Sequence, residues 1–185
     1  MIDDEWSIIT VDQHHKPVKT VRRHGWFLSG SDPTVDVSGS RHGVTLLGAI
    51  SHDGESFFTW SEEKLTAEHG IALLRAIQAE FGENVVVLLD RAPYFYARDL
   101  WEFVSGERTT EYVDETSVEC VVGDSLQVWY FPAHAPELNP VEGCWDQFES
   151  WFNYRLVRDF EQLLNQLRTA LSTIDPPKIS NYLCP

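Results

Sequence analysis

Residues 131–145 read FPAHAPELNPVEGCW. The stretch leaves a strand-like apolar segment, is interrupted by prolines that forbid regular structure, and then begins a helix. Asn139 can cap that helix, Pro140 suits its first position, and Glu142 falls three residues after the cap. The stretch therefore holds one carboxylate near a helix N-terminus. A purely structural explanation exists, because Asn-x-x-Glu is close to a capping box, in which the acid only satisfies a backbone N–H.

Two further acids follow strand-like apolar runs. Asp12 comes after WSIITV at 6–11, and Asp90 comes after VVVLL at 85–89. Catalytic and ligand-binding groups collect at the carboxyl ends of strands in α/β sheets. The order of the elements brings Asp12 and Asp90 onto adjacent central strands, with Glu142 on a helix beside them. Asp12, Asp90 and Glu142 are therefore the candidate catalytic and metal-binding residues.

Three clustered carboxylates repel one another unless a divalent cation neutralises them. Oxygen ligands favour Mg²⁺ or Mn²⁺ over zinc, and two such ions can activate a water and stabilise the leaving oxygen of a phosphodiester. The pattern thus predicts a two-ion site that acts on phosphate esters. A weaker alternative is the acid and nucleophile pair of a glycoside hydrolase, for which only the aromatic residues 94–96 offer sugar-stacking groups nearby.

The rest of the chain predicts an α/β fold in one domain spanning residues 1–185. Strands are expected at 6–11, 18–28, 44–50, 57–60, 85–89 and 125–131, and helices at 66–81, 94–104, 140–155 and 159–174. The first third reads as an antiparallel meander, and the uninterrupted run at 85–89 suits a strand with parallel neighbours. Residues 105–125 are acidic and are expected to form an exposed, irregular insertion.

Composition limits the function classes. With 43% hydrophobic and 23% charged residues, the chain is expected to fold, and no apolar run reaches the length of a membrane span or of a signal segment. A cytoplasmic protein without a membrane partner is therefore predicted. Three widely spaced cysteines form neither a disulfide framework nor a zinc motif.

The net charge of −15 argues against polyanionic partners. An acidic, lysine-poor surface suits a protein that works in concentrated salt, which leads to the hypothesis of a halophilic source; the alternative is an ordinary protein that avoids nucleic acid. The basic stretch at 14–24, HHKPVKTVRRH, is either a solvated hairpin face or a strip that contacts DNA phosphates. The candidate DNA-binding residues are Lys16, Lys19, Arg22, Arg23 and, beside the 131–145 stretch, His134, although a loop histidine is more often merely solvated.

Asp12, the VLLDRAP segment around Asp90, and FPAHAPELNPVEGCW together resemble the catalytic domain of Tc/mariner-type DDE transposases, in their bacterial and archaeal insertion-sequence branch. The resemblance implies an RNase H-like mixed five-stranded sheet flanked by helices. It also implies that Asp12, Asp90 and Glu142 bind metal, while Pro136, Asn139, Pro140 and Trp145 form the frame that orients Glu142. Glu137, the nearest rival acid, is structural by the same resemblance.

The family's activity is metal-dependent cleavage at transposon ends and transfer of the exposed strand to target DNA, often at a TA dinucleotide. Family members work as paired complexes on DNA, so a dimer on DNA is expected. Full-length relatives carry helix-turn-helix domains before the first strand, and none is expected within residues 1–185. A separate or missing DNA-reading partner is therefore implied.

The sequence departs from the family pattern beside two of the acids. The family commonly has Asp-Glu at the first acid and Asp-Asn-Ala at the second, whereas this chain has Asp12-Gln13 and Asp90-Arg91-Ala92. The interval between Asp90 and Glu142 is also longer than is usual. The alternative hypothesis is a decayed or repurposed RNase H-like module that contacts DNA or assists assembly without catalysis.

Overall fold

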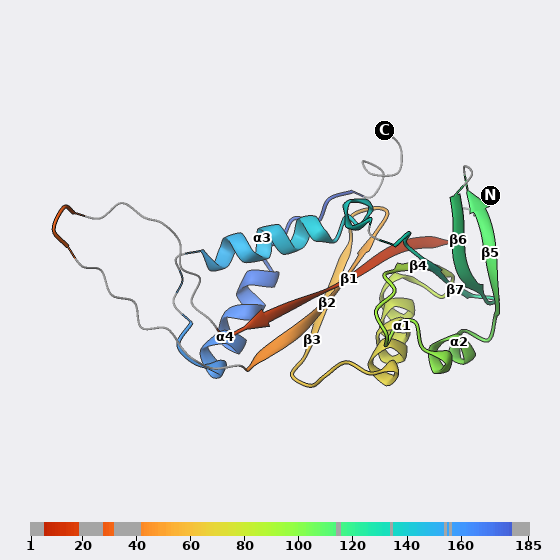
Figure 1. The fold of residues 1–185 in the computed structure, drawn as a ribbon, viewed down its shortest axis with the longest axis horizontal. Coiled ribbons are helices and arrows are strands. Elements are labelled where there is room, and N and C mark those ends of the chain that lie inside the picture. Colours follow the sequence, from red (N-terminus) through yellow and green to blue (C-terminus); the bar gives the residue numbers. More distant parts are fainter. Residues whose placement is uncertain are drawn as a thin grey trace.

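The computed structural model describes residues 6–18, 28–31, 42–113, 116–133, 135–153, 155 and 157–178. They form one mixed sheet with helices on both faces (Figure 1). The strands are β1 (Ser7–Pro17), β2 (Gly43–Ser51), β3 (Ser56–Ser61), β4 (Val85–Leu89), β5 (Glu107–Val113), β6 (Thr116–Val122) and β7 (Leu126–Tyr130). The helices are α1 (Ala67–Phe81), α2 (Arg98–Val104), the 3-10 turn η1 (Pro136–Leu138), α3 (Glu142–Phe152) and α4 (Phe160–Leu171).

The seven strands lie in the order β3-β2-β1-β4-β7-β6-β5. Strand β4 pairs in parallel with β1 on one side and with β7 on the other, and the remaining pairs are antiparallel. Four of the five residues of β4 are buried, as its uninterrupted apolar run predicts for a strand covered on both faces. The centre of the sheet is therefore the parallel part, and its carboxyl edge is where functional groups are expected.

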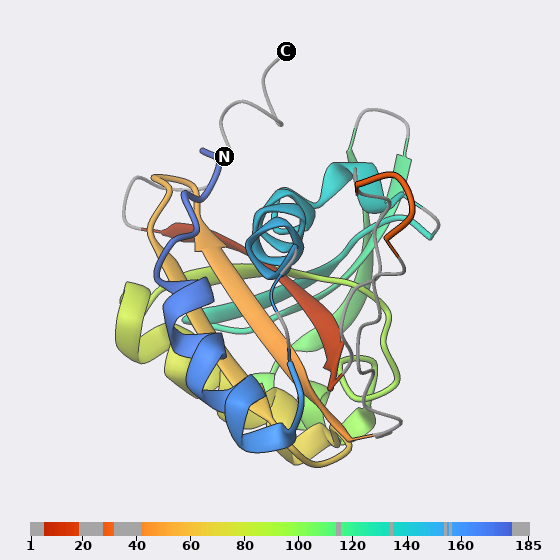
Figure 2. The same ribbon diagram turned by 90° about the vertical axis from the view of Figure 1, so that its left-hand side faces the viewer.

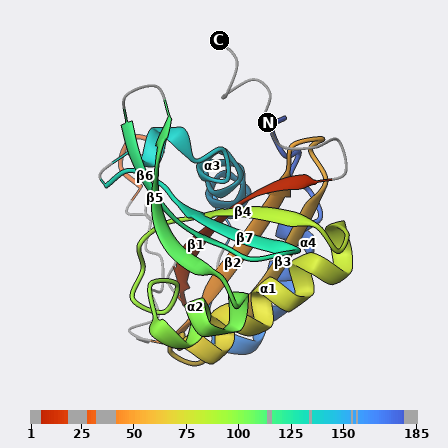
Figure 3. The ribbon, with the colours of Figure 1, turned by 90° about the vertical axis from the view of Figure 1, so that its right-hand side faces the viewer.

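Two hydrophobic clusters lie on opposite faces of the sheet. Leu73, Leu74 and Ile77 of α1 and Leu100 of α2 pack on one face, against alternate residues of the central strands. Phe148 and Phe152 of α3 and Leu163 and Leu167 of α4 pack on the other. Figure 2 shows α3 and α4 in front of the sheet, and Figure 3 shows α1 and α2 along the opposite face. In the part of the chain that the structure describes, no helix is both long and apolar enough to cross a membrane.

The sheet has seven strands, which corrects the expectation of five. Residues 105–125, predicted to be an irregular insertion, mostly form the hairpin β5-β6, and β6 continues the sheet beyond β7 through pairs such as Val121 with Val128. The acidic composition of the segment concealed its strand character. Runs such as ERTTEYV and TSVECVV are nevertheless rich in the β-branched residues that strands favour.

The first strand does not end at Asp12 but continues to Pro17. Residues 13–17 remain paired with β2, as in Gln13 with Leu47 and Pro17 with Gly43. The parallel pairing with β4, by contrast, stops at Thr10 and Leu88. Asp12 therefore lies just past the point where β1 loses its parallel neighbour. Most of the predicted strand at 18–28 lies outside the described residues.

The predicted helices are present, with shorter bounds in three cases. Helix α1 confirms the expected span after Thr66, which occupies its N-cap position. Helix α2 begins at Arg98 rather than 94, α3 covers 142–152 rather than 140–155, and α4 covers 160–171 rather than 159–174. These differences concern helix ends, where capping turns replace the regular hydrogen bonds.

Candidate active site

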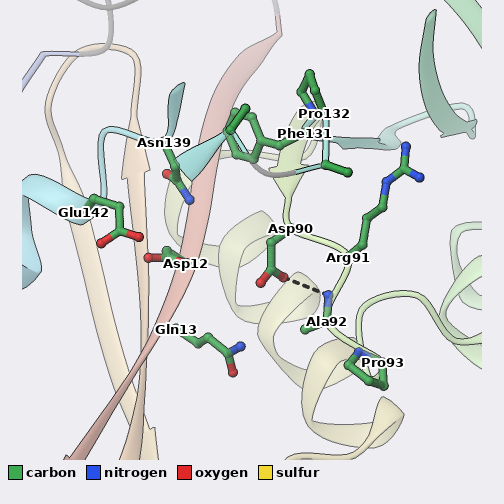
Figure 4. Close-up of a pocket in the computed structure, with 12 residues that line it drawn as sticks. Asp12, Gln13, Asp90, Arg91, Ala92, Pro93, Phe131, Pro132, Asn139 and Glu142 are labelled. Carbon is green, nitrogen blue, oxygen red and sulfur yellow. Dashed lines mark hydrogen bonds between the residues drawn. The ribbon is translucent and has the colours of Figure 1, made fainter. Parts of the chain in front are cut away.

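A cavity of about 520 Å³ lies at the carboxyl ends of β4 and β7. The residues that line it come from three separate parts of the chain and include all three predicted acids (Figure 4). They are Asp12, Gln13, Asp90, Arg91, Ala92, Pro93, Phe131, Pro132, Ala133, Ala135, Asn139 and Glu142. The fold thus brings together acids that are separated by as much as 130 positions in the sequence.

Asp12 is the most enclosed of the three carboxylates, with 8% of the residue exposed. The indole Nε1 of Trp145 donates a hydrogen bond of 2.8 Å to its Oδ2. Burial raises the pKa of Asp12 from 3.8 to about 6, and the negative charges of Glu142 and Asp90 add to that increase. Asp12 is therefore the acid that interacts with both of the others and the one whose charge most needs compensation.

Asp90 directly follows β4 and is fixed by a local turn. Its Oδ1 accepts a hydrogen bond of 3.1 Å from the backbone N–H of Ala92. Burial raises the pKa of Asp90 above its ordinary value, although the bond from Ala92 opposes that increase. The carboxylate is thus held at the strand end in a partly desolvated position.

Glu142 is the first residue of α3, and the turn before it is anchored to β1. The backbone N–H of Glu142 donates to the carbonyl of Asn139, and the side-chain oxygen of Asn139 accepts from the N–H of Val141. The Asn139 Nδ2 donates across to the carbonyl of Val11, beside Asp12. The predicted cap is therefore wrong: Val141, not Asn139, occupies the N-cap position of α3 and makes no side-chain cap bond. Asn139 instead stabilises the turn before the helix and ties it to β1, next to the first acid. In Figure 4 the carboxylates of Asp12 and Glu142 point toward one another.

The bond from Trp145 to Asp12 was not foreseen, because the resemblance assigned Trp145 to the frame of Glu142. Gly48 explains how the indole reaches Asp12. This glycine pairs with Asp12 across β1 and β2, and a Cβ at this position would lie 2.9 Å from the Trp145 ring and 3.0 Å from Phe58. The glycine within the apolar run at 44–50 was the sequence signal for a close approach of this kind.

A second interaction missed in the sequence joins Gln13 to the loop after Asp90. The hydroxyl of Tyr94 donates to the side-chain oxygen of Gln13, which lines the cavity. Burial, together with the charges of Asp90 and Asp12, raises the pKa of Tyr94 well above its ordinary value, so the hydroxyl stays protonated and remains a donor. No local pattern indicated this pair, because the two residues are 81 positions apart.

Lys16 corrects the prediction that it belongs to an exposed DNA-binding strip. Lys16 is only 2% exposed. Its Nζ donates a hydrogen bond of 2.8 Å to the Glu149 carboxylate and lies 4.2 Å from the Phe152 ring centroid. His14 contacts the other carboxylate oxygen of Glu149 at 2.8 Å and stacks on Trp145. Burial alone raises the pKa of Glu149, but the bonds from His14 and Lys16 outweigh it and lower that pKa to about 2.

The remaining candidates for DNA contact, Lys19, Arg22, Arg23 and His134, lie outside the described residues. Arg91, which directly follows Asp90, forms an ion pair with Glu119, with 3.8 Å between Nη1 and Oε2. The cavity between the acids is therefore not filled by this guanidinium.

The donor set fits a hard divalent cation, because carboxylate oxygens are the ligands that Mg²⁺ and Mn²⁺ prefer, and burial leaves at least two of these groups short of solvation. Within the described ranges, no three His, Cys, Asp or Glu side chains converge closely enough to hold one ion together. The carboxylates thus line one cavity without closing around a single point.

The cavity lies at the carboxyl edge of the parallel strands, which is where α/β proteins bind their ligands. A family model described as DDE superfamily endonuclease matches residues 7–164, and the chain belongs to this family. No curated protein sequence matches the chain.

Solved structures show the same fold. The Mos1 mariner paired end complex with Mn aligns with a TM-score of 0.63 and 16% identity over 93% of this chain and 49% of that chain. The catalytic domain of Mos1 mariner transposase aligns with a TM-score of 0.55 and 15% identity over 91% and 71%. A simian T-cell lymphotropic virus intasome in complex with PP2A regulatory subunit B56 gamma aligns with a TM-score of 0.52 and 11% identity over 96% and 54%.

These alignments confirm the expected RNase H-like fold, with the two additional strands described above. The chain spans about half the length of the paired-end transposase chain that it matches.

Proposed function

We propose that this chain is the catalytic part of a transposase, which cleaves phosphodiester bonds at transposon ends and transfers the exposed strand to target DNA. The observation that carries the proposal is the gathering of Asp12, Asp90 and Glu142 around one cavity in a chain of the DDE endonuclease family. The similar Mos1 structures include paired-end complexes with Mn and with Mg and a strand-transfer complex. Those relatives support the same substrate class and metals here.

The three acids would hold Mg²⁺ or Mn²⁺, and we propose two ions. Asp12 is the acid whose pKa is raised by both Glu142 and Asp90, so its charge is the one that bound metal would stabilise most. When bound, such ions lower the pKa of a water molecule and stabilise charge on the leaving oxygen. Trp145 and Asn139 keep the first and third acids in place, and the turn at Ala92 keeps the second.

We propose further that the domain acts as a dimer on DNA, together with a helix-turn-helix region that reads the transposon ends. The paired-end complexes of the similar structures support a paired arrangement. The insertion-sequence origin, a cytoplasmic location and a salt-rich habitat belong to the same proposal, and the charge of −15 supports the last of these.

Nicking of supercoiled plasmid tests the proposed function. Purified protein is incubated in high salt with Mg²⁺, Mn²⁺ or EDTA, with Asp90→Asn as the inactive control. Metal-dependent nicking that disappears in Asp90→Asn is expected. Nicking that persists in EDTA or in Asp90→Asn would contradict the proposal, and complete inactivity of the wild type with every metal would favour the decayed-module alternative.

A further inference from the structure

Arg91 is a cationic residue in the wall of an otherwise acidic cavity. It directly follows Asp90, lines the cavity, and has 42% of its side chain exposed. In Figure 4 its guanidinium extends away from Asp12 and Glu142, on the far side of Asp90. The acids and the Arg91 guanidinium therefore occupy separate parts of the same cavity. A substrate that carries phosphates would meet a cation at the Arg91 end directly, and at the acidic end only when metal is bound.

The partner of Arg91 is already neutralised by other groups. Glu119 of β6 accepts a hydrogen bond of 2.6 Å from the Tyr96 hydroxyl and forms a close ion pair with Arg108 of β5. Burial alone raises the pKa of Glu119, but these contacts lower it overall, so the carboxylate stays ionised. Its ion pair with Arg91 is the longer one, at 3.8 Å.

Arg108 is fixed in its pairing position by aromatic rings. Its guanidinium carbon lies 4.4 Å from the Trp101 ring centroid and 5.1 Å from that of Tyr96. Two guanidinium groups thus share the one carboxylate of Glu119. Because Arg108 is the more tightly held of the two, the free bonding capacity belongs to Arg91.

We infer that Arg91 binds a backbone phosphate of the DNA strand that enters the cavity, beside the bond placed at the acids. This inference rests on the proposed function and adds a substrate-binding residue to it. A guanidinium presents paired N–H donors to two phosphate oxygens, which an amide cannot match in charge. Glu119 orients Arg91 from the protein side. Because Arg108 already pairs closely with Glu119, the carboxylate does not fully neutralise the charge of Arg91.

The test measures binding of a short fluorescein-labelled DNA duplex to the wild type and to Arg91→Gln, across a salt series, with Ca²⁺ in place of Mg²⁺ so that cleavage does not interfere. Arg98→Gln is the matched control. Arg98 is an exposed arginine of α2, with 84% of its side chain accessible and a pair with Glu102, so the variant makes the same change in net charge away from the cavity. Melting temperatures check that each variant is folded.

Arg91→Gln is expected to weaken binding about tenfold and to reduce the salt dependence by about one phosphate contact, whereas Arg98→Gln retains the wild-type values. Arg91→Lys is expected to recover part of the affinity, because it restores the charge without the paired donors. Equal binding by Arg91→Gln and the wild type would overturn this inference and leave the proposed function intact. Absence of any DNA binding by the wild type at low salt would overturn both.

Discussion

Asp12 combines deep burial with two acidic neighbours, so its ionised form opposes folding when no cation is bound. Its folded-state pKa of about 6 exceeds the unfolded value of 3.8. The stability associated with this group is therefore complete below pH 3.8 and is lost as the pH rises through about 6. The burial of Asp90 acts in the same direction.

Replacing Asp12 with asparagine should therefore stabilise the metal-free protein while abolishing nicking. The amide oxygen can still accept the bond from Trp145, and the loss of the charge removes a penalty of up to about 3 kcal/mol above pH 6. Thermal unfolding in EDTA should show a higher melting temperature for Asp12→Asn at pH 8 and little difference at pH 4. A lower melting temperature at pH 8 would show that the Asp12 charge is compensated without metal.

Lys16 shows how a basic residue can belong to the core rather than to a DNA-binding surface. Lys16→Gln removes the cation from a buried pair with Glu149 and from the Phe152 ring, and should destabilise the fold by about 2 kcal/mol. The salt dependence of DNA binding should not change. Denaturant unfolding and the fluorescein-duplex assay measure the two effects, and an unchanged stability with weakened DNA binding would restore Lys16 to the predicted basic strip.

At the scale of elements, the site depends on the close approach of α3 to β2. Because Gly48 has no side chain, the Trp145 ring can pack against β2 in the position from which its Nε1 donates to Asp12. Gly48→Ala should displace the ring, cost about 1–3 kcal/mol of stability and slow nicking. Trp145→Phe removes the N–H that donates to Asp12 but keeps an aromatic ring. This variant therefore measures the loss of the hydrogen bond apart from the overpacking that Gly48→Ala causes.

A double-mutant cycle with these two substitutions measures the coupling. If Gly48 acts through Trp145, the double variant should be less impaired than the sum of the single variants, because a smaller ring leaves room for the added methyl group. Strict additivity of both stability and nicking rate would contradict the proposed route from Gly48 to Asp12.

Elements with a strong local pattern could be predicted from the sequence. The unbroken apolar run predicted β4, and the apolar stripe after Thr66 predicted α1. The segment from Asn139 to Glu142 predicted that a helix follows it, although α3 begins at Glu142 and has Val141 rather than Asn139 as its N-cap. The prediction of an irregular insertion at 105–125 was wrong, because the polar and acidic residues there obscured two strands that pair with each other and with β7. Similarly, β1 continues past Asp12 because β2, not β4, supports it there.

The same distinction applies to the site. The three acids could be singled out because Asp12 and Asp90 follow apolar runs and Glu142 begins α3, and the structure places all three around one cavity. Their role as metal ligands stays a prediction. The residues that position or neutralise them act through contacts between distant segments: Trp145 with Asp12 and Lys16 with Glu149 are each separated by 133 positions. A single sequence carries no signal for such long-range pairs. The one hint is Gly48, whose place within an apolar strand suggests that another group approaches the backbone closely there.

At the scale of the whole molecule, the charge of −15 predicts a marked dependence of stability on salt. At about 1 M salt the screening length falls to about 3 Å, so repulsion among exposed carboxylates largely disappears. The melting temperature in EDTA should rise from low salt to about 1 M NaCl. An unchanged or falling melting temperature over that range would contradict the salt-rich habitat.

Calorimetric titration of Mn²⁺ into the metal-free protein measures whether Asp12, Asp90 and Glu142 together bind divalent metal, as proposed. The wild type at pH 8 should bind Mn²⁺ and gain melting temperature with increasing Mn²⁺, while folded Asp12→Asn and Asp90→Asn should lose most of the affinity. Absence of binding by the wild type, or equal binding by the variants, would contradict the claim.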